Sequence, residues 1–572
     1  MSYPRPRAAA IRQPHPVPPP QVLLGSPQDQ PRIGAARRTR ASPGGIASRE
    51  EPSSTGGPPV STPSSSTGRS VGPQVETTSG TVRGTSGPGG TRIFKGVPYA
   101  EAPVGNLRFR APRPAPRWTG VRSAVHDAPV APQRVSNPFT GAGPDTEQSE
   151  DCLTLTVTTP PTTTDDAPRP VLVWFHGGDN VTGSGSAPAY AGDALALRGD
   201  VVVVTVSYRL GALGWVDFSS FSTSQHIFET NLGLRDQIAA LEWVRDNISA
   251  FGGDPGAVTV GGQSAGATSV TTLLCVPSAA GLFHRAIAMS PDVAGVSGAE
   301  RAAGWARDYV NWLRTTESLA VDALLTAPPK ELADATARLA ALVAKETPGA
   351  SCTRPVVDGD LLPEHPVDVL TEGRGHPVPL LAGSTKHEGL PFVGSRRSAV
   401  PTTSEAIDLF FEINDPGAQL TVLSAYPGYP SMRARAQLGG DAMFWVPTVT
   451  AARAHAEQAP TFVYRYDVTT PALNLRGHGG GHGTELVPTF GTLSSSRARA
   501  LTRLGGLEDL TAVSERMQDA WTSFVRTGTP GTGWPTYDSD DRLTKVFASR
   551  DRVVSDPGRE RRRAWEGVAR YR

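Results

Sequence analysis

The sequence predicts an α/β fold, with a large and mostly parallel β-sheet flanked by helices. Residues 171–175 (VLVWF) and 201–206 (VVVVTV) are short and almost wholly apolar, which is typical of strands buried on both faces. Between positions 234 and 248, apolar residues recur every three or four places, as on one side of an amphipathic helix. Buried strands that alternate with such helices indicate a parallel sheet.

The first 74 residues predict a disordered tail. They mix proline, serine, glycine and arginine and contain almost no aromatic residues, so they cannot bury enough apolar surface to offset the entropy lost on ordering. Their apolar patch at residues 22–24 is far shorter than a signal-peptide h-region of about 7 to 15 residues. We therefore expect a cytoplasmic protein with one large folded domain over residues 75–567. A translation start further downstream would remove the tail, and a different start or export route would allow secretion.

Charge and cysteine content exclude several classes of function. The chain has 55 Lys and Arg against 54 Asp and Glu, so no net field attracts nucleic acid or an anionic membrane. No apolar run approaches the roughly 20 residues of a membrane span. Cys152, Cys275 and Cys352 are far apart and form no C-x-x-C motif, which argues against a zinc site or a disulfide framework. We expect a soluble protein with buried free thiols and neither nucleic-acid nor membrane partners.

The order of elements along the folded domain follows from local patterns. Residues 75–84 alternate apolar and polar positions as a hairpin does, and residues 150–157 alternate as a strand does. Residues 94–112 are rich in aromatics and prolines and predict a rigid surface segment. An alanine-rich helix is expected at 332–343. Apolar strands are expected at 378–381 and 462–466.

A serine motif lies at the centre of this pattern. The β-branched residues 258–260 lead into Gly262, Gln263, Ser264, Ala265 and Gly266, and small residues then open a helix. G-x-S-x-G between a strand and a helix is the nucleophile elbow, which lifts a serine hydroxyl above the end of a sheet. An ordinary glycine-rich turn is the alternative, and the flanking strand and helix favour the elbow.

A serine nucleophile needs a histidine base, and the base needs a carboxylate that fixes its tautomer. After an elbow the acid and then the histidine follow along the chain. Glu388 fits the acid, because it lies in a polar loop just after the strand predicted at 378–381. Asp358 and Asp360 compete, although their surroundings (PVVDGDLLP) predict a turn.

Two histidines, His478 and His482, fit the base, and spacing does not choose between them. A pair four residues apart also suits a metal, but no third ligand cluster accompanies it, so we predict no metal and no cofactor. His176, Gly177, Gly178 and Asp179 follow the strand at 171–175. This H-G-G-x turn can aim backbone N–H groups at an oxyanion, together with the N–H of Ala265.

These motifs, with further blocks along the chain, resemble the type-B carboxylesterases. That α/β-hydrolase family includes carboxylesterases, cholinesterases, some lipases and the non-catalytic neuroligins. The resemblance covers residues 75–565. The blocks that carry it include GVPYAEAPVGNLRF, SEDCLTLTV, WFHGG, SYRLGALGW, FGGDPGAVTVGGQSAGA, GLFHRAIAMS, GSTKHEG and HGTEL.

The resemblance implies an α/β-hydrolase catalytic domain that cleaves small-molecule carboxylic esters through an acyl-enzyme. The family base lies in H-G-x-E-L, which selects His482, and the family acid lies in G-x-x-x-x-E-G, which selects Glu388. The oxyanion donors would be the N–H groups of Gly178, Asp179 and Ala265. Structural ion pairs would join Arg108 to Glu150 and Arg209 to Asp236.

The chain departs from the family pattern at several positions. Asp179 stands where the family has the last glycine of H-G-G-G; it keeps its N–H, so we expect activity. Gln263 replaces the usual glutamate before the serine, which weakens attraction for cationic substrates. Residues 131–134 (APQR) stand where the family has C-P-Q, so Cys152 lacks its partner, and the tryptophan of choline sites is missing. A choline esterase is therefore not expected.

Two alternatives remain beside the esterase prediction. One is a non-catalytic binding or adhesion module on the same scaffold, as in neuroligins, although all three triad residues are present here. The other is a lipase or amide hydrolase that uses the same triad. The sequence makes no prediction of acyl-chain length or oligomeric state.

Overall fold

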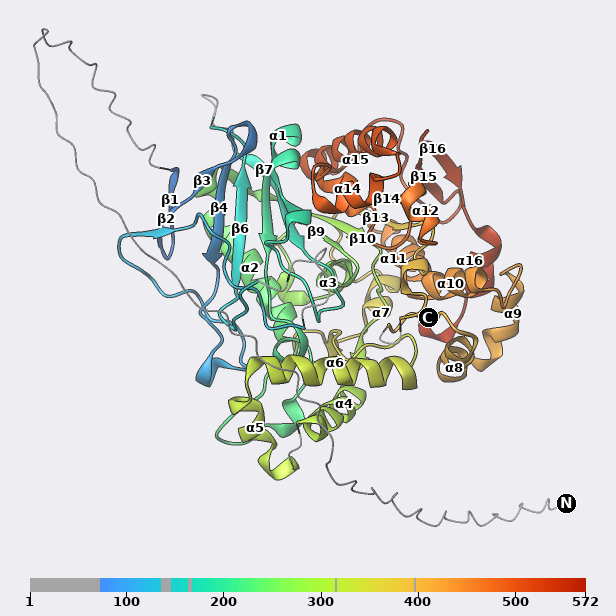
Figure 1. The fold of residues 1–572 in the computed structure, drawn as a ribbon, viewed down its shortest axis with the longest axis horizontal. Helices are drawn as coiled ribbons and strands as arrows, with labels where there is room; N and C mark the ends of the chain where they lie inside the picture. The colour runs from blue at the N-terminus through green and yellow to red at the C-terminus, as the bar shows by residue number, and fades with distance from the viewer. Residues whose placement is uncertain are drawn as a thin grey trace, which may run out of the picture. The chain divides into compact units, whose positions relative to one another are not determined.

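The computed structural model describes residues 72–134, 143, 146–162, 167–313, 316–395 and 398–571. Within them, an eleven-stranded sheet runs through the folded unit in the order β16-β15-β14-β13-β10-β9-β7-β8-β6-β4-β3 (Figure 1). The pairs from β15 to β8 are parallel, and the pairs at both edges are antiparallel. The predicted α/β class with a mostly parallel sheet is confirmed. The predicted tail at residues 1–74 lies almost entirely outside the described residues.

The strands of the large sheet are β3 (Thr85–Ser86), β4 (Arg92–Pro98), β6 (Thr154–Thr159), β7 (Arg169–Phe175), β8 (Val202–Val206), β9 (Gly253–Gln263), β10 (Arg285–Met289), β13 (Leu380–Thr385), β14 (Thr461–Tyr466), β15 (Leu543–Phe547) and β16 (Arg552–Ser555). A small sheet holds β1 (Gln74–Thr77), β2 (Gly80–Arg83) and β5 (Val121–Ser123), and β11 (Ser297–Gly298) pairs with β12 (Val356–Val357).

The α-helices are α1 (Asp193–Gly199), α2 (Leu232–Asn247), α3 (Ala265–Leu273), α4 (Ala299–Trp312), α5 (Ala320–Thr326), α6 (Pro329–Glu346), α7 (Pro366–Thr371), α8 (Ser404–Asn414), α9 (Gln419–Ser424), α10 (Met432–Gly440), α11 (Val446–Ala456), α12 (Pro471–Leu475), α13 (Leu486–Phe490), α14 (Ser496–Thr502), α15 (Leu507–Thr527) and α16 (Arg559–Trp565). Helices α4, α5 and α6 form a group beside the sheet, at the bottom of Figure 1.

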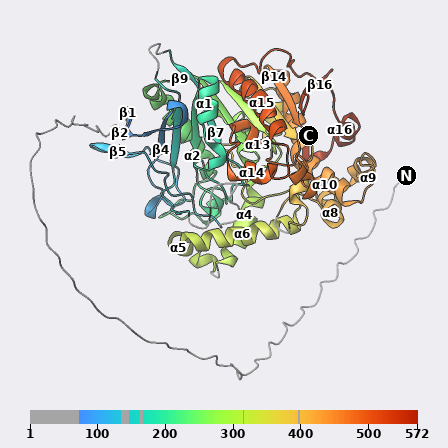
Figure 2. The same cartoon turned by 45° about the horizontal axis from the view of Figure 1, so that its top comes forward.

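Two apolar cores cover the two faces of the sheet. Along β7, Val171, Val173 and Phe175 belong to one core, with α2, α3, α7 and α11, whereas Leu172 and Trp174 belong to the other, with α1 and α15. Side chains of a strand alternate between faces, so an unbroken apolar run such as VLVWF feeds both cores. Helices α1 and α15 lie together over the second face (Figure 2).

Most of the elements predicted from the sequence are present. The hairpin is β1–β2, the buried runs are β7 and β8, the amphipathic helix is α2, and the alanine-rich helix is α6. The prediction of a surface segment at 94–112 was wrong at its start and at Phe109, which is buried. Phe94 and Val97 belong to β4, which pairs with β6, and they are buried together with Tyr99. The aromatic residues there point into the core. Their burial depends on pairing with β6, which the composition of residues 94–112 does not indicate.

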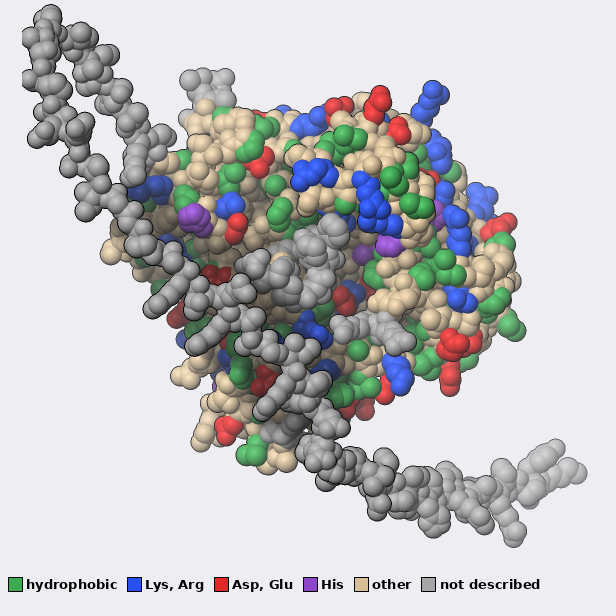
Figure 3. Space-filling model, in the orientation of Figure 1, with side chains coloured by type: hydrophobic (Ala, Val, Ile, Leu, Met, Phe, Trp, Pro, Cys, Tyr) green, Lys and Arg blue, Asp and Glu red, His purple; other side chains and the backbone are tan. Residues whose placement is uncertain are grey.

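Polar and charged features agree with the composition. Acidic and basic side chains are interspersed over the described surface seen in Figure 3. Cys152, Cys275 and Cys352 are free and buried, as expected. Among the described helices, none has the length and apolarity needed to cross a bilayer.

Two glycines allow β9, the turn at Ser264 and α3 to pack closely. A Cβ on Gly262 would lie 2.4 Å from the carbonyl carbon of Gly266, and a Cβ on Gly266 would lie 2.1 Å from the Phe175 carbonyl oxygen at the end of β7. Real Cβ atoms do not approach backbone this closely. The N-terminus of α3 therefore packs directly against the end of β7, and only glycine at position 266 permits this contact.

Gly266→Ala should destabilise the protein by about 1–3 kcal/mol, because the added methyl forces the backbone of α3 away from β7. Gly304→Ala is the matched control, because Gly304 lies in α4, where the nearest atom to an added Cβ is the end of the Arg307 side chain at 4.0 Å. That change should stabilise by up to about 1 kcal/mol, the helix preference for alanine. Thermal unfolding should therefore give a lower melting temperature for Gly266→Ala than for Gly304→Ala. Equal melting temperatures in the two variants would contradict the close packing of α3 on β7.

Candidate active site

Ser264 occupies a strained turn at the end of a central strand. Its backbone has φ 58° and ψ −124°, between β9 and the first residue of α3. Its N–H donates to the Met289 carbonyl of β10 (2.8 Å), which fixes the turn against the neighbouring strand. Strain of this kind persists only where surrounding structure enforces it, and it places the half-buried hydroxyl above the edge of the sheet.

Glu388 and His482 come together from loops that follow β13 and β14. His482 Nδ1 lies 2.6 Å from Glu388 Oε2, and the Glu388 side chain is 1% exposed. A buried carboxylate at this distance accepts a hydrogen bond from the Nδ1–H group, which leaves Nε2 as the basic nitrogen. His478, the alternative that spacing left open, makes no hydrogen bond to Glu388 in the described structure.

Two further groups hold the Glu388 carboxylate. Its Oε1 accepts hydrogen bonds from the Ser290 hydroxyl (2.7 Å) and the Thr385 N–H (2.5 Å). These bonds leave Oε2 facing His482. Ser290 was not predicted as a site residue; its signal in the sequence is a serine directly after β10, the strand next to the nucleophile strand.

The His482 ring is held by aromatic side chains and by Gln263. Phe444 stacks on it with centroids 4.2 Å apart, and Phe392 lies at 5.4 Å. Gln263 Nε2 is 3.2 Å from His482 Nε2, so the amide donates to the lone pair that a base would use. In the described structure no hydrogen bond joins Ser264 Oγ to His482. The Gln263 amide thus occupies the position on Nε2 that a serine proton would take.

The oxyanion turn follows β7 and lies against the elbow. A Cβ on Gly177 would be 3.1 Å from the Ser264 Cβ, so this glycine lets the turn approach the serine. Gly178 and Asp179 follow with φ of 120° and 55°. In the described residues their N–H groups donate to no protein acceptor, and Ala265, as the first residue of α3, has no partner within the helix. All three N–H groups are available to an anion.

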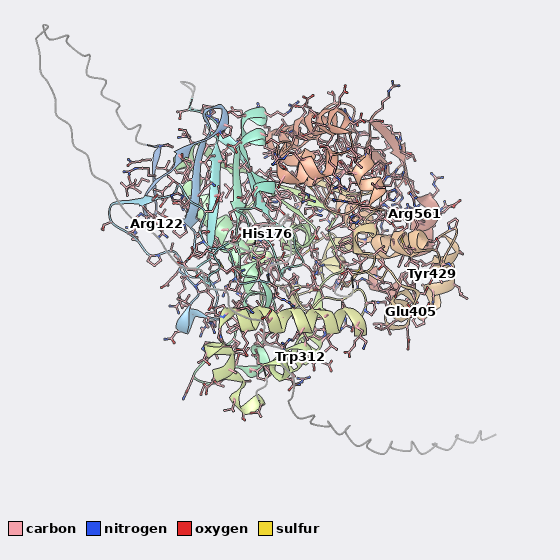
Figure 4. The ribbon with its side chains drawn as sticks, in the orientation of Figure 1. Arg122, His176, Trp312, Glu405, Tyr429 and Arg561 are labelled. Carbon is pink, nitrogen blue, oxygen red and sulfur yellow. The ribbon has the colours of Figure 1, made fainter. Side chains whose placement is uncertain are left out.

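His176 supports this turn from within the core (Figure 4). Its ring stacks on Tyr208 with centroids 4.4 Å apart, and the Tyr208 hydroxyl donates to the His176 carbonyl (2.6 Å). Burial lowers the pKa of His176 to about 4, so the ring is neutral near pH 7. Its Nδ1 lies 2.8 Å from the Gly177 carbonyl.

The competing acids and the expected ion pairs are structural. Asp358 accepts from Thr230, from Asn231 and from two backbone N–H groups, and Asp360 pairs with Arg235. Both belong to a turn, as predicted. Arg108 contacts Glu150, and Arg209 Nη2 lies 2.6 Å from Asp236 Oδ1. No group of three or more His, Cys, Asp or Glu side chains in the described residues is arranged to hold a metal ion.

A cavity of about 210 Å³ borders the oxyanion turn. Asp179 lines it on one side, Leu210 and Ala212 line another, and α6 closes it with Ala333 and Ala337. Apolar atoms form most of its surface. Small side chains on α6 leave this space open beside one of the candidate oxyanion donors.

Glu485 is the acid of the HGTEL block, three residues after His482, and the sequence assigned it no role. It is fully buried, and neither carboxylate oxygen meets a donor with good geometry in the described residues. Burial and the nearby Glu388 raise its pKa to about 8, against smaller opposing effects of its own N–H, of Arg497 and of the Gly483 N–H. Glu485 therefore keeps its proton at neutral pH and adds no negative charge next to Glu388.

Comparisons with known proteins place this geometry in context. The model of the carboxylesterase family matches residues 71–561. The para-nitrobenzyl esterase of Bacillus subtilis (strain 168) is 36% identical over 85% of this chain and 97% of its own. The phenmedipham hydrolase of Pseudarthrobacter oxydans is 35% identical over 82% and 93%. A solved thermophilic pNB esterase superposes with a TM-score of 0.77 at 36% identity, over 86% of this chain and 99% of its own.

The raised pKa of Glu485 predicts a pH dependence of stability. The unfolded carboxyl ionises near pH 4.5, whereas the folded one keeps its proton to about pH 8, so this group stabilises the fold below pH 4.5 and that contribution falls as pH rises to 8. Glu485→Gln removes this titration. Melting temperatures measured from pH 5 to 8 should therefore fall less steeply in the variant than in the wild type. A parallel pair of curves would contradict the assignment.

Proposed function

The chain belongs to the carboxylesterase family and is a serine ester hydrolase of the α/β-hydrolase fold, and we propose that Ser264, His482 and Glu388 form its catalytic triad. The observation that carries this proposal is the 2.6 Å contact between His482 Nδ1 and Glu388 Oε2, beside the strained turn at Ser264. A non-catalytic scaffold has no need of a buried acid, an oriented imidazole and an elbow serine at one edge of a sheet.

In the proposed mechanism, Ser264 Oγ attacks the ester carbonyl while His482 Nε2 accepts its proton. Glu388 holds the ring through Nδ1 and stabilises the imidazolium as it forms. His482 then protonates the leaving alcohol, an acyl group remains on Ser264, and water activated by the same imidazole releases the acid. In this protein the Gln263 amide bonds to His482 Nε2, so it must move away when substrate binds, and the Ser264 hydroxyl must take its place. Catalytic hydrogen bonds often form or tighten only in the substrate complex.

The oxyanion formed at the carbonyl is assigned to three backbone donors. The N–H groups of Gly178, Asp179 and Ala265 are the free donors next to Ser264, and two of them lie on the turn after β7. Each donor of such a hole contributes about 10² to 10³ in kcat. The carbonyl of the substrate would therefore lie between the turn and the first residue of α3.

For the substrate, we propose an ester with an apolar group that enters the cavity between Asp179 and α6. The cavity is mostly apolar and adjoins one oxyanion donor, so a group attached to the reacting carbonyl or its alcohol can reach it. Arg134, paired with Asp334, and Asp179, paired with Arg354, leave no net charge there to recruit an ionic substrate.

Ser264→Ala should lower kcat for p-nitrophenyl acetate by roughly 10⁶ and leave the melting temperature within a few degrees, because only the nucleophilic oxygen is removed. Glu388→Gln should also lower kcat, since the ring loses its charged partner. Hydrolysis assays on purified variants check both. Turnover retained by Ser264→Ala would place the chemistry at another group.

Filling the cavity should change selectivity. Ala337→Phe removes space for the apolar group, and each methylene that loses its burial costs about 0.8 kcal/mol, so activity on long-chain esters should fall about tenfold or more while acetate turnover holds. Ala344→Phe, on α6 but away from the cavity lining, is the matched control. Series of p-nitrophenyl acyl esters and of alkyl acetates test the acyl and alcohol sides, and a uniform loss in both series contradicts the proposal.

A further inference from the structure

We infer that Arg354 is a positioning residue of the oxyanion turn, which neutralises the Asp179 carboxylate so that this charge does not oppose the oxyanion. The inference rests on the proposed function of the same site. It follows from a difference between this chain and the family pattern. Asp179, whose N–H we assign to the oxyanion hole, carries a carboxylate at a position where the family has glycine.

An unpaired carboxylate at this position would act against catalysis. The Asp179 side chain and its N–H share one Cα, so the carboxylate lies within a few bonds of the donor. Negative charge develops on the substrate oxygen in the transition state, and a like charge nearby raises its energy, most strongly where water is excluded. Catalysis by this turn therefore needs the Asp179 charge to be balanced.

Arg354 supplies that balance. Its Nη2 lies 3.1 Å from Asp179 Oδ1, and the Ser351 hydroxyl donates to Oδ2 (3.3 Å). Only 8% of the Arg354 side chain is exposed, so solvent screens the pair little on that side. Arg354 Nη1 also donates to Thr268 Oγ1 (3.1 Å) in α3, and Thr268 donates its N–H to the Ser264 carbonyl (2.9 Å). The guanidinium thus joins the oxyanion turn to the nucleophile helix.

The neighbouring residues hold the turn by its backbone, independently of charge. The Thr353 hydroxyl donates to the Asp179 carbonyl (2.8 Å), and the Asn180 amide donates to the Thr353 carbonyl (2.7 Å). These bonds support the left-handed conformations of Asp179 and Asn180, with φ of 55° and 56°. Removing the Arg354 charge alone should therefore leave the turn in place and change its electrostatics.

The other charges near Asp179 make Arg354 more important. Loss of hydration raises the pKa of the Asp179 carboxyl, Asp292 raises it further, and Arg354 and Ser351 lower it. The side chain keeps 41% of its surface exposed, towards the cavity it lines, so the rise is smaller than full burial would give. Asp292 is itself paired with Arg570 (3.2 Å), and Arg134 across the cavity is paired with Asp334. Without Arg354, Asp179 keeps no ion pair with any residue that the structure describes.

A double-mutant cycle tests the inference. Arg354→Gln should lower kcat for p-nitrophenyl acetate about 10- to 100-fold and change KM by less than about threefold, because the loss falls on the transition state. Asp179→Gly should leave kcat equal or higher, since the charge disappears and the N–H stays. The double variant Asp179→Gly with Arg354→Gln carries neither charge and should recover about the kcat of the wild type. Arg301→Gln is the matched control: Arg301 is an exposed arginine of α4 that makes no ion pair with Asp179 in the described structure, so this variant should match the wild type.

A pH series separates charge from structure. As pH falls, Asp179 takes up a proton in Arg354→Gln and the opposing charge disappears, so the kcat deficit of this variant against the double variant should shrink towards acid pH. If Arg354→Gln does not fold, Arg354→Lys carries the same test, because its shorter reach weakens the pairing and Asp179→Gly should restore its kcat.

Several results would overturn the inference. They are an unchanged kcat in Arg354→Gln, a double variant as slow as Arg354→Gln, and a thousandfold drop in Asp179→Gly. Failure of the proposed function is distinguishable, because Ser264→Ala would then keep the activity of the wild type whatever happens at Arg354.

Discussion

The close approach of backbone at Gly262 and Gly266 is the constraint on which the site depends. It seats α3 on the end of β7 and forces Ser264 into a conformation with positive φ. The same strand end continues into the oxyanion turn, where a Cβ on Gly177 would lie 3.1 Å from the Ser264 Cβ. Nucleophile and oxyanion donors therefore share one rigid junction, formed by atoms that cannot move independently. This backbone packing fixes the position of the nucleophile relative to the oxyanion donors, and it does so independently of the charged groups.

Three carboxyl groups lie near that junction, and each is stabilised in a different way. Glu388 accepts hydrogen bonds from the Ser290 hydroxyl and the Thr385 N–H, and its other oxygen faces His482. Glu485 has no hydrogen bond of good geometry in the described residues, and burial raises its pKa so that it holds a proton at neutral pH. Asp179 relies on an ion pair with Arg354. Gln263 carries no charge where the family pattern has a glutamate, and its amide contacts His482. The result is a site in which one carboxylate faces the imidazole and the others are neutral or paired.

The sequence was most informative where local chemistry decides structure. The runs at β7 and β8 and the glycines of the elbow could be recognised because strand burial and tight turns need particular residues at adjacent positions. Residues 94–112 were misread because the destination of Phe94 depends on β6, far along the chain. The contacts Ser290–Glu388 and Gln263–His482 join residues 98 and 219 positions apart, and no local pattern marks them. Arg354 likewise becomes meaningful only once the fold places it on Asp179. His482 was separated from His478 by family resemblance, and the structure independently brings His482 to Glu388.

Covalent labelling with a fluorophosphonate, followed by peptide mapping, tests the central claim most directly. The probe phosphonylates a serine only when a neighbouring base activates it and an oxyanion hole stabilises the adduct. We expect one label per chain, on the peptide that contains Ser264, and no label in the folded Ser264→Ala variant. A folded wild-type protein that takes up no label, or takes it up on another serine, would contradict the account.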